Sequence, residues 1–201
     1  AFDVGIEQNM FKNRAKLTAT YFYTRLIDTI GYDNSATSFG RFGGYINTKG
    51  GIARGFELSG DLRPTSSTDI FVSYTYTNSD QHEPQAGGTN ILSTLGVPSN
   101  QFTAVVTQRI KRFWVTFDLL ATSDYLAPIL DTNNLSYLTY VYRFDGNRRA
   151  DLTAGYTFSL NKDKFSLRVF GTIENLFDYD YFENGFRTAG INGRVGVSFG
   201  F

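Results

Sequence analysis

The sequence predicts an all-β protein, an antiparallel meander of about nine strands that forms part of a transmembrane β-barrel. Three observations support this fold class. Apolar and polar residues alternate with the period of two that a strand imposes on its side chains. The connections between these segments are short and long in turn, and aromatic residues gather near the segment ends. No stretch of comparable length shows the 3.6-residue repeat of a helix.

Nine segments carry the alternation. In the first of them, Phe2, Val4 and Ile6 alternate with polar residues and glycine. Each segment therefore offers one apolar face and one polar face. The nine predicted strands are Phe2–Met10, Lys16–Thr24, Phe56–Arg63, Ile70–Thr77, Phe102–Val106, Phe113–Leu119, Leu152–Leu160, Phe165–Ile173 and Arg194–Phe201.

The connections between the segments alternate in length. A meander with this arrangement places its tight turns at one end and its long loops at the other, where binding residues usually lie. Short turns are predicted near Phe11–Arg14, Pro64–Asp69, Lys111–Arg112 and Asn161–Lys164. Long, polar or glycine-rich connections are predicted near Asp33–Gly51, Gln81–Asn100, Asp124–Arg149 and Asp178–Asn192.

A soluble β-sandwich is the alternative to a barrel. Against it, most of the strands are longer than the five or six residues of most globular sheets. The second face is rich in Thr, Ser, Gly, Asp and Arg, and aromatics such as Tyr74 and Tyr76 stand near strand ends, as interfacial girdles do. The pattern favours a barrel with an apolar outside, a polar lumen, periplasmic turns and extracellular loops. Val197 and Leu167 are then expected to face lipid.

The composition excludes several classes of protein. The chain has 201 residues, 19 basic and 19 acidic, so its neutral balance gives no sign of nucleic-acid binding. The absence of cysteine excludes disulfides and thiolate metal sites. A 16% share of aromatic residues argues against disorder. No apolar run is long enough for a transmembrane helix, and the mean hydropathy is −0.24, because lipid-facing and lumen-facing residues cancel in the average.

The predicted number of strands, nine, is odd. Bacterial single-chain barrels normally have an even number, with both termini periplasmic. Here the last strand ends on the short-turn side and the first begins on the long-loop side. We therefore expect the chain to be the C-terminal part of a larger barrel, with its first residue outside the cell.

The end of the chain carries a recognisable pattern. A polar residue, a glycine and two aromatics are spaced as in the C-terminal signal of outer-membrane barrels, which this segment resembles. The resemblance implies recognition by the barrel-assembly machinery through strand pairing. The residues of the pattern are Arg194, Gly196, Phe199 and Phe201.

Three further stretches resemble motifs of TonB-dependent receptors. Gly171–Asp178, followed by Tyr179 and Tyr181, is similar to the "NLFD…Y" segment of their penultimate strand. Arg54–Leu58 is similar to their "RGxE" hairpin, and Thr18–Asp28 to their "YFY…I.D" strand. The residues carrying the first two motifs are Arg54, Gly55, Glu57, Asn175, Leu176, Phe177 and Asp178.

This resemblance implies a barrel of about 22 strands in the bacterial outer membrane. Residues 1–201 would supply its last nine strands, and the plug domain, the TonB box and the earlier strands would belong to the parent protein. It also implies active import of a scarce nutrient, a ferric siderophore foremost, with cobalamin, haem, an oligosaccharide or another metal chelate as alternatives. The implied partners are outer-membrane lipid and lipopolysaccharide, the small-molecule ligand, the TonB complex and the assembly machinery. No cofactor and no nucleic acid are expected, and a passive, porin-like barrel is the alternative function.

The resemblance also directs attention to residues of the long connections. Tyrosines and arginines there would suit an anionic, partly aromatic iron chelate. The alternative is that the tyrosines belong to a girdle and the arginines contact lipopolysaccharide phosphates or line the lumen. The candidates are Tyr45, Tyr137, Tyr140, Arg143, Arg148, Arg149, Tyr181, Phe186 and Arg187.

Enzymatic activity has little support in the sequence. Hydrolysis would need a histidine to activate a nucleophile or a water molecule. The chain has one histidine, His82, with Ser79 and Asp80 near it. A solvated loop histidine is the simpler interpretation, and we predict that the protein is not an enzyme.

Overall fold

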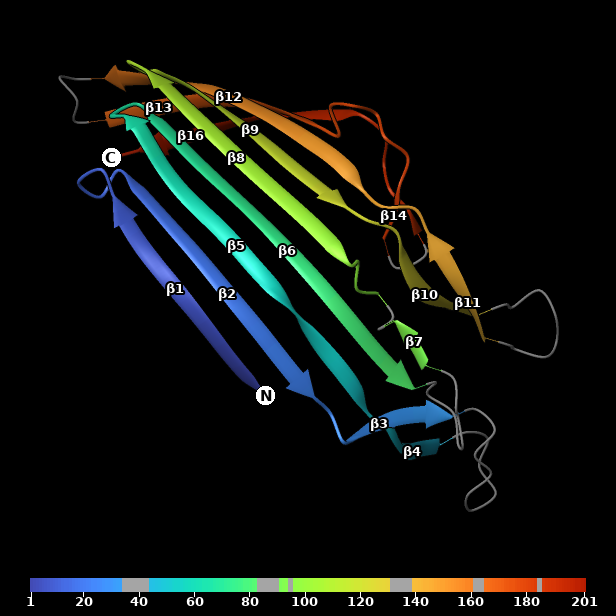
Figure 1. Cartoon of the computed structure of the whole chain (residues 1–201). Coiled ribbons are helices and arrows are strands. Elements are labelled where there is room, and N and C mark those ends of the chain that lie inside the picture. Colours follow the sequence, from blue (N-terminus) through green and yellow to red (C-terminus); the bar gives the residue numbers. More distant parts are fainter. Residues whose placement is uncertain (34–43, 83–90, 94–95, 131–138, 161–164, 184–185) are drawn as a thin grey trace.

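A single curved sheet of long, tilted strands dominates the computed structural model (Figure 1). The structure describes residues 1–33, 44–82, 91–93, 96–130, 139–160, 165–183 and 186–201. The nine long strands are β1 (Phe2–Met10), β2 (Ala15–Arg25), β5 (Gly51–Thr65), β6 (Thr68–His82), β8 (Asn100–Ile110), β9 (Phe113–Thr122), β12 (Arg148–Leu160), β13 (Phe165–Glu174) and β16 (Asn192–Gly200).

The long strands follow one another in chain order across the sheet. The order is β1-β2-β5-β6-β8-β9-β12-β13-β16, and every neighbouring pair is antiparallel. The predicted meander of nine strands is therefore confirmed. In the described part of the chain β1 and β16 form the two edges and do not pair with each other, so these strands alone leave the barrel open.

Short strands occupy parts of the long connections, which the hydrophobic pattern did not resolve. Three of the connections contain separate two-stranded hairpins, and the remaining connection contains β7, which pairs with the end of β6. These elements extend beyond the loop-side ends of the main strands (Figure 1). They are β3 (Asp28–Asp33) with β4 (Gly44–Lys49), β10 (Tyr125–Leu130) with β11 (Thr139–Phe144), β14 (Phe182–Glu183) with β15 (Phe186–Arg187), and β7 (Ile91–Ser93).

The tight turns lie at the opposite end of the strands. Between β1 and β2 the chain turns through Phe11, Lys12 and Asn13, all with φ between 52° and 64°. β5 runs through Pro64 to Thr65, with an irregular register after Leu62, so the predicted turn there is shorter than expected. Proline is tolerated where the ladder is already broken. The predicted turn at 161–164 lies outside the described residues.

The register places like side chains together on two faces. Tyr21 pairs with Val4 and Phe56 on one face, whereas Thr20 pairs with Gly5 and Glu57 on the other. Val197 and Leu167 share the apolar face, as predicted, opposite Val169 and Phe199. We call the apolar face the outer face and the polar face the inner face.

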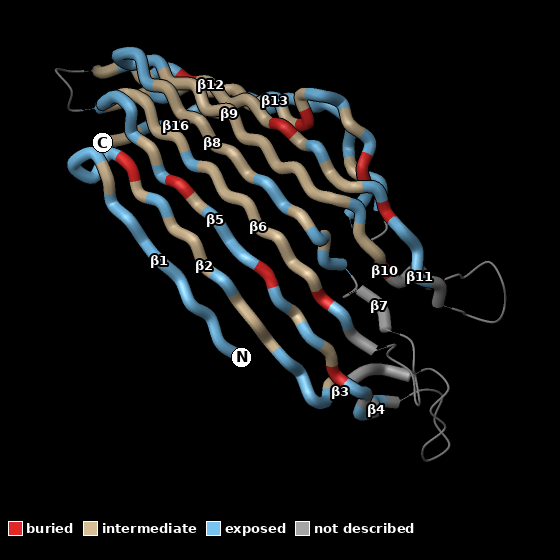
Figure 2. Tube along the Cα trace, viewed as in Figure 1, coloured by how far each residue is buried: buried red, intermediate tan, exposed pale blue. Residues whose placement is uncertain are grey.

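The apolar side chains of the outer face are largely exposed. Val195 is 82% exposed and Val197 65%, and most of the chain is exposed or half-buried in Figure 2. A β-sandwich would cover such a face with a second sheet, but among the described residues no element covers it. An apolar surface of this extent is stable against lipid. Within the described residues no helix is long and apolar enough to cross a membrane.

Aromatic side chains form two bands on the outer face. One lies toward the loop side of β1 to β6, where Phe56 and Tyr74 have ring centroids 5.8 Å apart. The other lies toward the turn side of β9 to β16, where Phe165 and Phe199 stack at 5.9 Å. The predicted gathering of aromatics near strand ends is confirmed for the second band. In the first band, Phe56, Tyr74 and Tyr76 lie near the middle of β5 and β6, because these strands extend further toward the loop side than predicted. The first band consists of Phe2, Tyr21, Tyr23, Phe56, Tyr74 and Tyr76. The second consists of Phe113, Tyr156, Phe158, Phe165 and Phe199.

On the inner face, aromatic rings lie over glycines of neighbouring strands. Trp114 pairs with Gly155, and a Cβ atom on that glycine would stand 2.8 Å from the indole. Phe170 covers Gly196 in the same way. The guanidinium of Arg168 also lies over the indole, 4.8 Å from the ring centroid. Glycine at these positions gives the rings room to lie flat along the sheet.

Candidate ligand-binding site

The inner face is a polar wall. Across β8 and β9, the hydroxyl oxygens of Thr107 and Thr116 are 2.9 Å apart, and Thr153 and Thr172 make the same contact at 3.0 Å between β12 and β13. Such pairs satisfy one another within the sheet and still present oxygen atoms to the lumen. The wall therefore suits contact with water or with polar groups.

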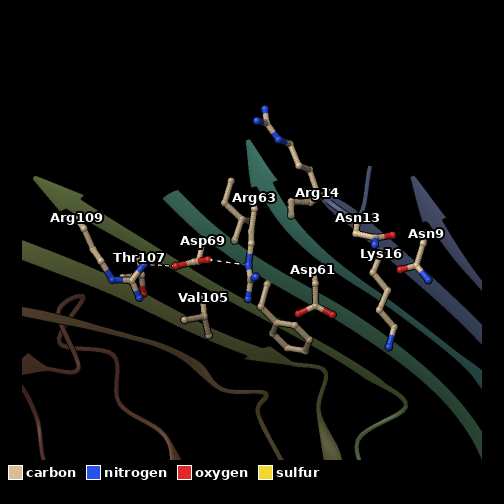
Figure 3. A pocket seen from close by; sticks show the side chains of 13 residues that line it. Asn9, Asn13, Arg14, Lys16, Asp61, Arg63, Asp69, Val105, Thr107 and Arg109 are labelled. Atoms are coloured by element: carbon tan, nitrogen blue, oxygen red, sulfur yellow. Dashed lines mark hydrogen bonds and ion pairs between the residues drawn. The ribbon is translucent and has the colours of Figure 1, made fainter. Parts of the chain in front are cut away.

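The turn-side end of the inner face has a hollow of about 530 Å³ (Figure 3). At its centre, Asp69 accepts a contact from Arg63 at 3.1 Å and another from Arg109. Lys16 and Glu7 pair at 2.8 Å nearby. The hollow lies at the opposite end of the strands from the loop hairpins, so a ligand captured by the loops would not touch it.

Nearer the loop side, Arg149 and Asp151 form a fork of hydrogen bonds on the inner face. The guanidinium donates to the carboxylate at 2.7, 3.0 and 3.1 Å. The Oδ1 atom of Asp151 also accepts the backbone N–H of Asn175 at 2.9 Å. Arg149 is one of the predicted ligand residues, but its guanidinium is held by Asp151 of the same strand, and Asp151 in turn joins β12 to the residue that follows β13.

The Asn175–Asp178 motif forms the loop-side exit of β13. Asn175 is 2% exposed. Its side-chain oxygen accepts the N–H of Tyr179 at 3.0 Å, and its side-chain nitrogen donates to the carbonyls of Tyr179 and Ala189. Asp178 accepts the N–H of Ile191 at 2.8 Å. Leu176 donates its N–H to the carbonyl of Ala150, whereas Phe177 is exposed. The motif thus fixes the path from β13 towards β16.

An aromatic cluster joins two of the loop hairpins. Phe144 of β11 is buried, with ring centroids 5.6 Å from Tyr125, 5.0 Å from Tyr142 and 5.7 Å from Phe182 of β14. The Tyr125 hydroxyl donates to the Phe182 carbonyl at 2.8 Å. We call these four residues the hairpin cluster. It holds the β10–β11 and β14–β15 hairpins side by side at the loop-side end of the sheet.

Two of the predicted ligand arginines stand on these hairpins. Arg143 donates to Asp124 at 2.6 Å, and Arg187 donates to both oxygens of Asp180 at 2.7 and 2.8 Å. The hydrogen bonds that Arg187 donates to Asp180 raise the pKa of Arg187, so that group stays protonated. Both guanidinium groups are more than 60% exposed and keep donors directed to solvent.

The other predicted ligand residues lie in different settings. Tyr45 of β4 is 80% exposed and Phe186 of β15 is 78% exposed, whereas Tyr181 is 4% exposed. Arg148 is exposed on the outer face, opposite Ala121. Tyr140 pairs with Ile129 in the β10–β11 hairpin, but its side chain, like the whole of Tyr137, lies outside the described residues. The structure therefore brings together Arg143, Phe186 and Arg187 on two neighbouring hairpins, and their role stays a prediction.

The Arg54–Glu57 motif spans both faces of β5. Arg54 lies opposite Tyr23 on the outer face, and Glu57 opposite Thr20 on the inner face. Gly55 lies under the ring of Phe22, which would come within 2.7 Å of a Cβ there. Packing thus explains the glycine, while the two charged residues are exposed.

The terminal pattern is part of the last strand. Arg194 forms an ion pair with Glu174, and Gly196 accommodates Phe170. Phe199 stacks on Phe165, but Phe201 is 99% exposed. The structure gives a packing reason for the first residues of the pattern and none for the last.

The arrangement of Ser79 and Asp80 does not favour catalysis. They are successive residues of β6, so their side chains point to opposite faces of the sheet. The side chain of His82 lies outside the described residues. In the part of the chain that is described, no three histidine or acidic side chains gather as a metal site requires.

The hairpin cluster is not predicted from the sequence. Tyr125, Phe144 and Phe182 stand in connections that were read only as long and polar. A signal was present, because the run Thr139–Phe144 alternates aromatic or apolar residues with others, as a strand would. Its shortness made it easy to overlook.

Several solved receptors have the same fold. The ferripyoverdine receptor of Pseudomonas aeruginosa matches at a TM-score of 0.69 and 18% identity, over 95% of this chain and 25% of the receptor. The siderophore receptor PiuA from Acinetobacter baumannii matches at 0.68 and 19%, over 97% and 27%. The FrpB iron transporter from Neisseria meningitidis matches at 0.68 and 16%, over 97% and 30%. The chain thus spans between a quarter and a third of the length of these receptors.

A search of the curated proteins gives no match. The family described as "TonB dependent receptor-like, beta-barrel" matches residues 1–176, which is most of the chain and includes every long strand except β16. The two-faced antiparallel sheet, the aromatic bands and the division into turn side and loop side agree with that match. The chain belongs to the TonB-dependent receptor β-barrel family of the bacterial outer membrane.

Proposed function

We propose that this chain is the C-terminal portion of an outer-membrane receptor that imports a scarce nutrient, a ferric siderophore foremost, with energy from the TonB complex. Family membership supports the receptor class. The observation that carries the proposal is the pair of neighbouring loop hairpins, which presents Arg143 and Arg187 beside exposed aromatic rings. Protonated guanidinium groups bind carboxylate or phenolate oxygens, and rings stack on a flat chelate.

The receptor would bind and move its ligand without chemical change. In this proposal the chain supplies the last nine strands of a barrel of about 22, and the polar inner face faces the segment of the parent protein that fills the lumen. The barrel-assembly machinery would recognise β16. The three solved proteins of this fold are receptors or transporters, and this supports a function in transport rather than in catalysis.

A growth assay tests the function directly. A strain without the parent gene is compared with its wild type on ferric siderophores, cobalamin, haem and glycans, each as the limiting source. We expect a growth defect on one iron chelate, reproduced when the TonB complex is deleted. A defect on none of these sources would contradict the proposal.

A passive barrel is the second candidate, because the polar inner face would equally line a water-filled pore. The TonB deletion separates the two functions. Uptake through a passive pore is independent of TonB and rises linearly with solute concentration, whereas receptor-driven uptake saturates.

The ligand residues have a test of their own. Arg143→Gln combined with Arg187→Gln should weaken binding of the chelate by roughly tenfold or more, since two charge-assisted contacts are lost. Arg63→Gln, on the inner face at the opposite end of the strands, is the matched control. Equal affinities of the double variant and the control in a titration would place the site elsewhere.

A further inference from the structure

Two arginines lie on the outer face close to its loop-side edge. Arg25 is the last residue of β2 and pairs with Ile52 of β5. Arg54 of β5 pairs with Tyr23 on one side and Asn78 on the other. Both arginines are exposed, and by their register they point outward with the apolar residues. We call them the outer arginine pair.

Their height on the sheet matches the edge of the membrane. Ala15 and Arg25 are the first and last residues of β2, so about 33 Å of strand separates them at about 3.3 Å per residue. A tilt of about 40° reduces this to about 25 Å along the membrane normal, which is the height of the apolar band of such barrels. The same arithmetic places Arg54 about 20 Å above the turn-side rim.

Neighbouring aromatic residues confirm that level. Tyr23, directly opposite Arg54, stacks with Phe2 at 5.5 Å, and the rings of Phe56 and Tyr76 stand 5.6 Å apart one step below. Aromatic rings gather where the hydrocarbon gives way to headgroups. The outer arginine pair therefore lies at the level of lipid headgroups on the loop side.

Within the described part of the chain, the side chains of the pair have no partner. On the inner face Arg63, Arg109, Arg149 and Arg194 each contact a carboxylate. Among the described residues the guanidinium of neither Arg25 nor Arg54 makes a hydrogen bond or an ion pair. Asp80 lies in the same row as Arg25 but two strands away, about 10 Å, which is too far for a direct contact.

We infer that Arg25 and Arg54 bind the phosphate groups of lipopolysaccharide in the outer leaflet. The guanidinium fork matches phosphate geometry with two parallel hydrogen bonds. The loop side faces the outer leaflet, so the phosphorylated end of that lipid meets the pair at headgroup level, while its acyl chains cover the apolar strands below. This inference rests on membership of the family and not on which nutrient is imported.

The test measures lipid that stays bound to the intact protein. Wild type and the double variant Arg25→Gln/Arg54→Gln are purified from outer membranes in mild detergent, and bound lipopolysaccharide and phospholipid are quantified separately by native mass spectrometry. Each arginine near an anionic lipid surface increases the binding affinity by a factor of about five. We expect bound lipopolysaccharide to fall by at least about fivefold, with phospholipid unchanged.

Two further variants complete the design. The double variant Lys12→Gln/Lys111→Gln removes two positive charges from the turns on the opposite rim. This variant should retain the same amount of bound lipopolysaccharide as the wild type. Arg25→Lys/Arg54→Lys preserves the charge and should retain most of the lipid even if the glutamine variant assembles poorly. Equal lipopolysaccharide in the glutamine variant and the turn control, or loss of phospholipid instead, would overturn the inference.

Discussion

At the scale of single residues, Asn175 shows how much one side chain can organise. Its φ of 51° lies in the left-handed region, which asparagine tolerates better than most residues. In that conformation the buried amide satisfies one N–H and two carbonyls of the following segment. The motif is therefore explained by local geometry, without any contact to a ligand.

Asn175→Ala should destabilise the protein. The substitution leaves buried backbone groups without partners and puts alanine at positive φ, which together cost about 3 kcal/mol. Unfolding in denaturant, with the intact protein in lipid vesicles, measures the loss. Asn192→Ala, which removes one 3.3 Å bond at an exposed site, is the control and should change stability by less than about 0.5 kcal/mol. Equal effects would contradict the structural role of Asn175.

At the scale of elements, the long strands were predictable and the loop hairpins were not. A period of two over about ten residues is hard to produce by chance, so the nine long strands of the main sheet could be predicted from the sequence. β14 and β15 are two residues long, too short for any periodicity to emerge. Their position depends on Phe182 meeting Phe144, a contact between residues that lie far apart in sequence.

The hairpin cluster should couple two loops. Phe144→Ala removes the ring shared by Tyr125, Tyr142 and Phe182, so both hairpins should open more often. Hydrogen exchange is expected to rise in 125–144 and in 182–187 together. Phe186→Ala, at a side chain that is 78% exposed, is the control and should leave exchange in 125–144 unchanged. A rise confined to the first hairpin would show that the cluster does not couple them.

The two faces of a strand should respond differently to charge. Ala104 and Thr103 are adjacent in β8, on the outer and inner face respectively. Ala104→Arg places a cation in lipid near the middle of the strand and should cost about 2–4 kcal/mol. Thr103→Arg faces the lumen and should cost far less. Stability measured in vesicles compares them directly, and equal costs would mean that the faces have been assigned the wrong way round.

At the scale of the whole molecule, we predict that Phe201 contributes to assembly more than to stability. Phe201 is 99% exposed and contacts the ring of Phe199 only loosely, at 6.5 Å. Its packing in the folded sheet is therefore too slight to account for a structural role. We therefore expect Phe201 to act in recognition before folding, as its resemblance to the terminal signal implies.

Deletion of Phe201 should lower the amount of folded protein in the outer membrane several-fold without changing the stability of the molecules that do fold. Pulse-labelling followed by the heat-modifiability assay measures the first quantity, and denaturant unfolding the second. Phe11→Ser is the control, because Phe11 is an exposed aromatic residue in a turn on the same side. A loss of stability in the deletion variant would assign Phe201 a packing role instead.

The sequence by itself determined the nine strands, their two faces and the separation of turns from loops. Each of these follows from local alternation and turn chemistry, which operate between residues close in the chain. Only the tertiary structure decided which side chains meet: Asp151 with Arg149 and Asn175, Phe144 with Phe182, and the outer arginine pair with no partner among the described residues. Such meetings depend on strand register and loop packing, which join residues distant in sequence.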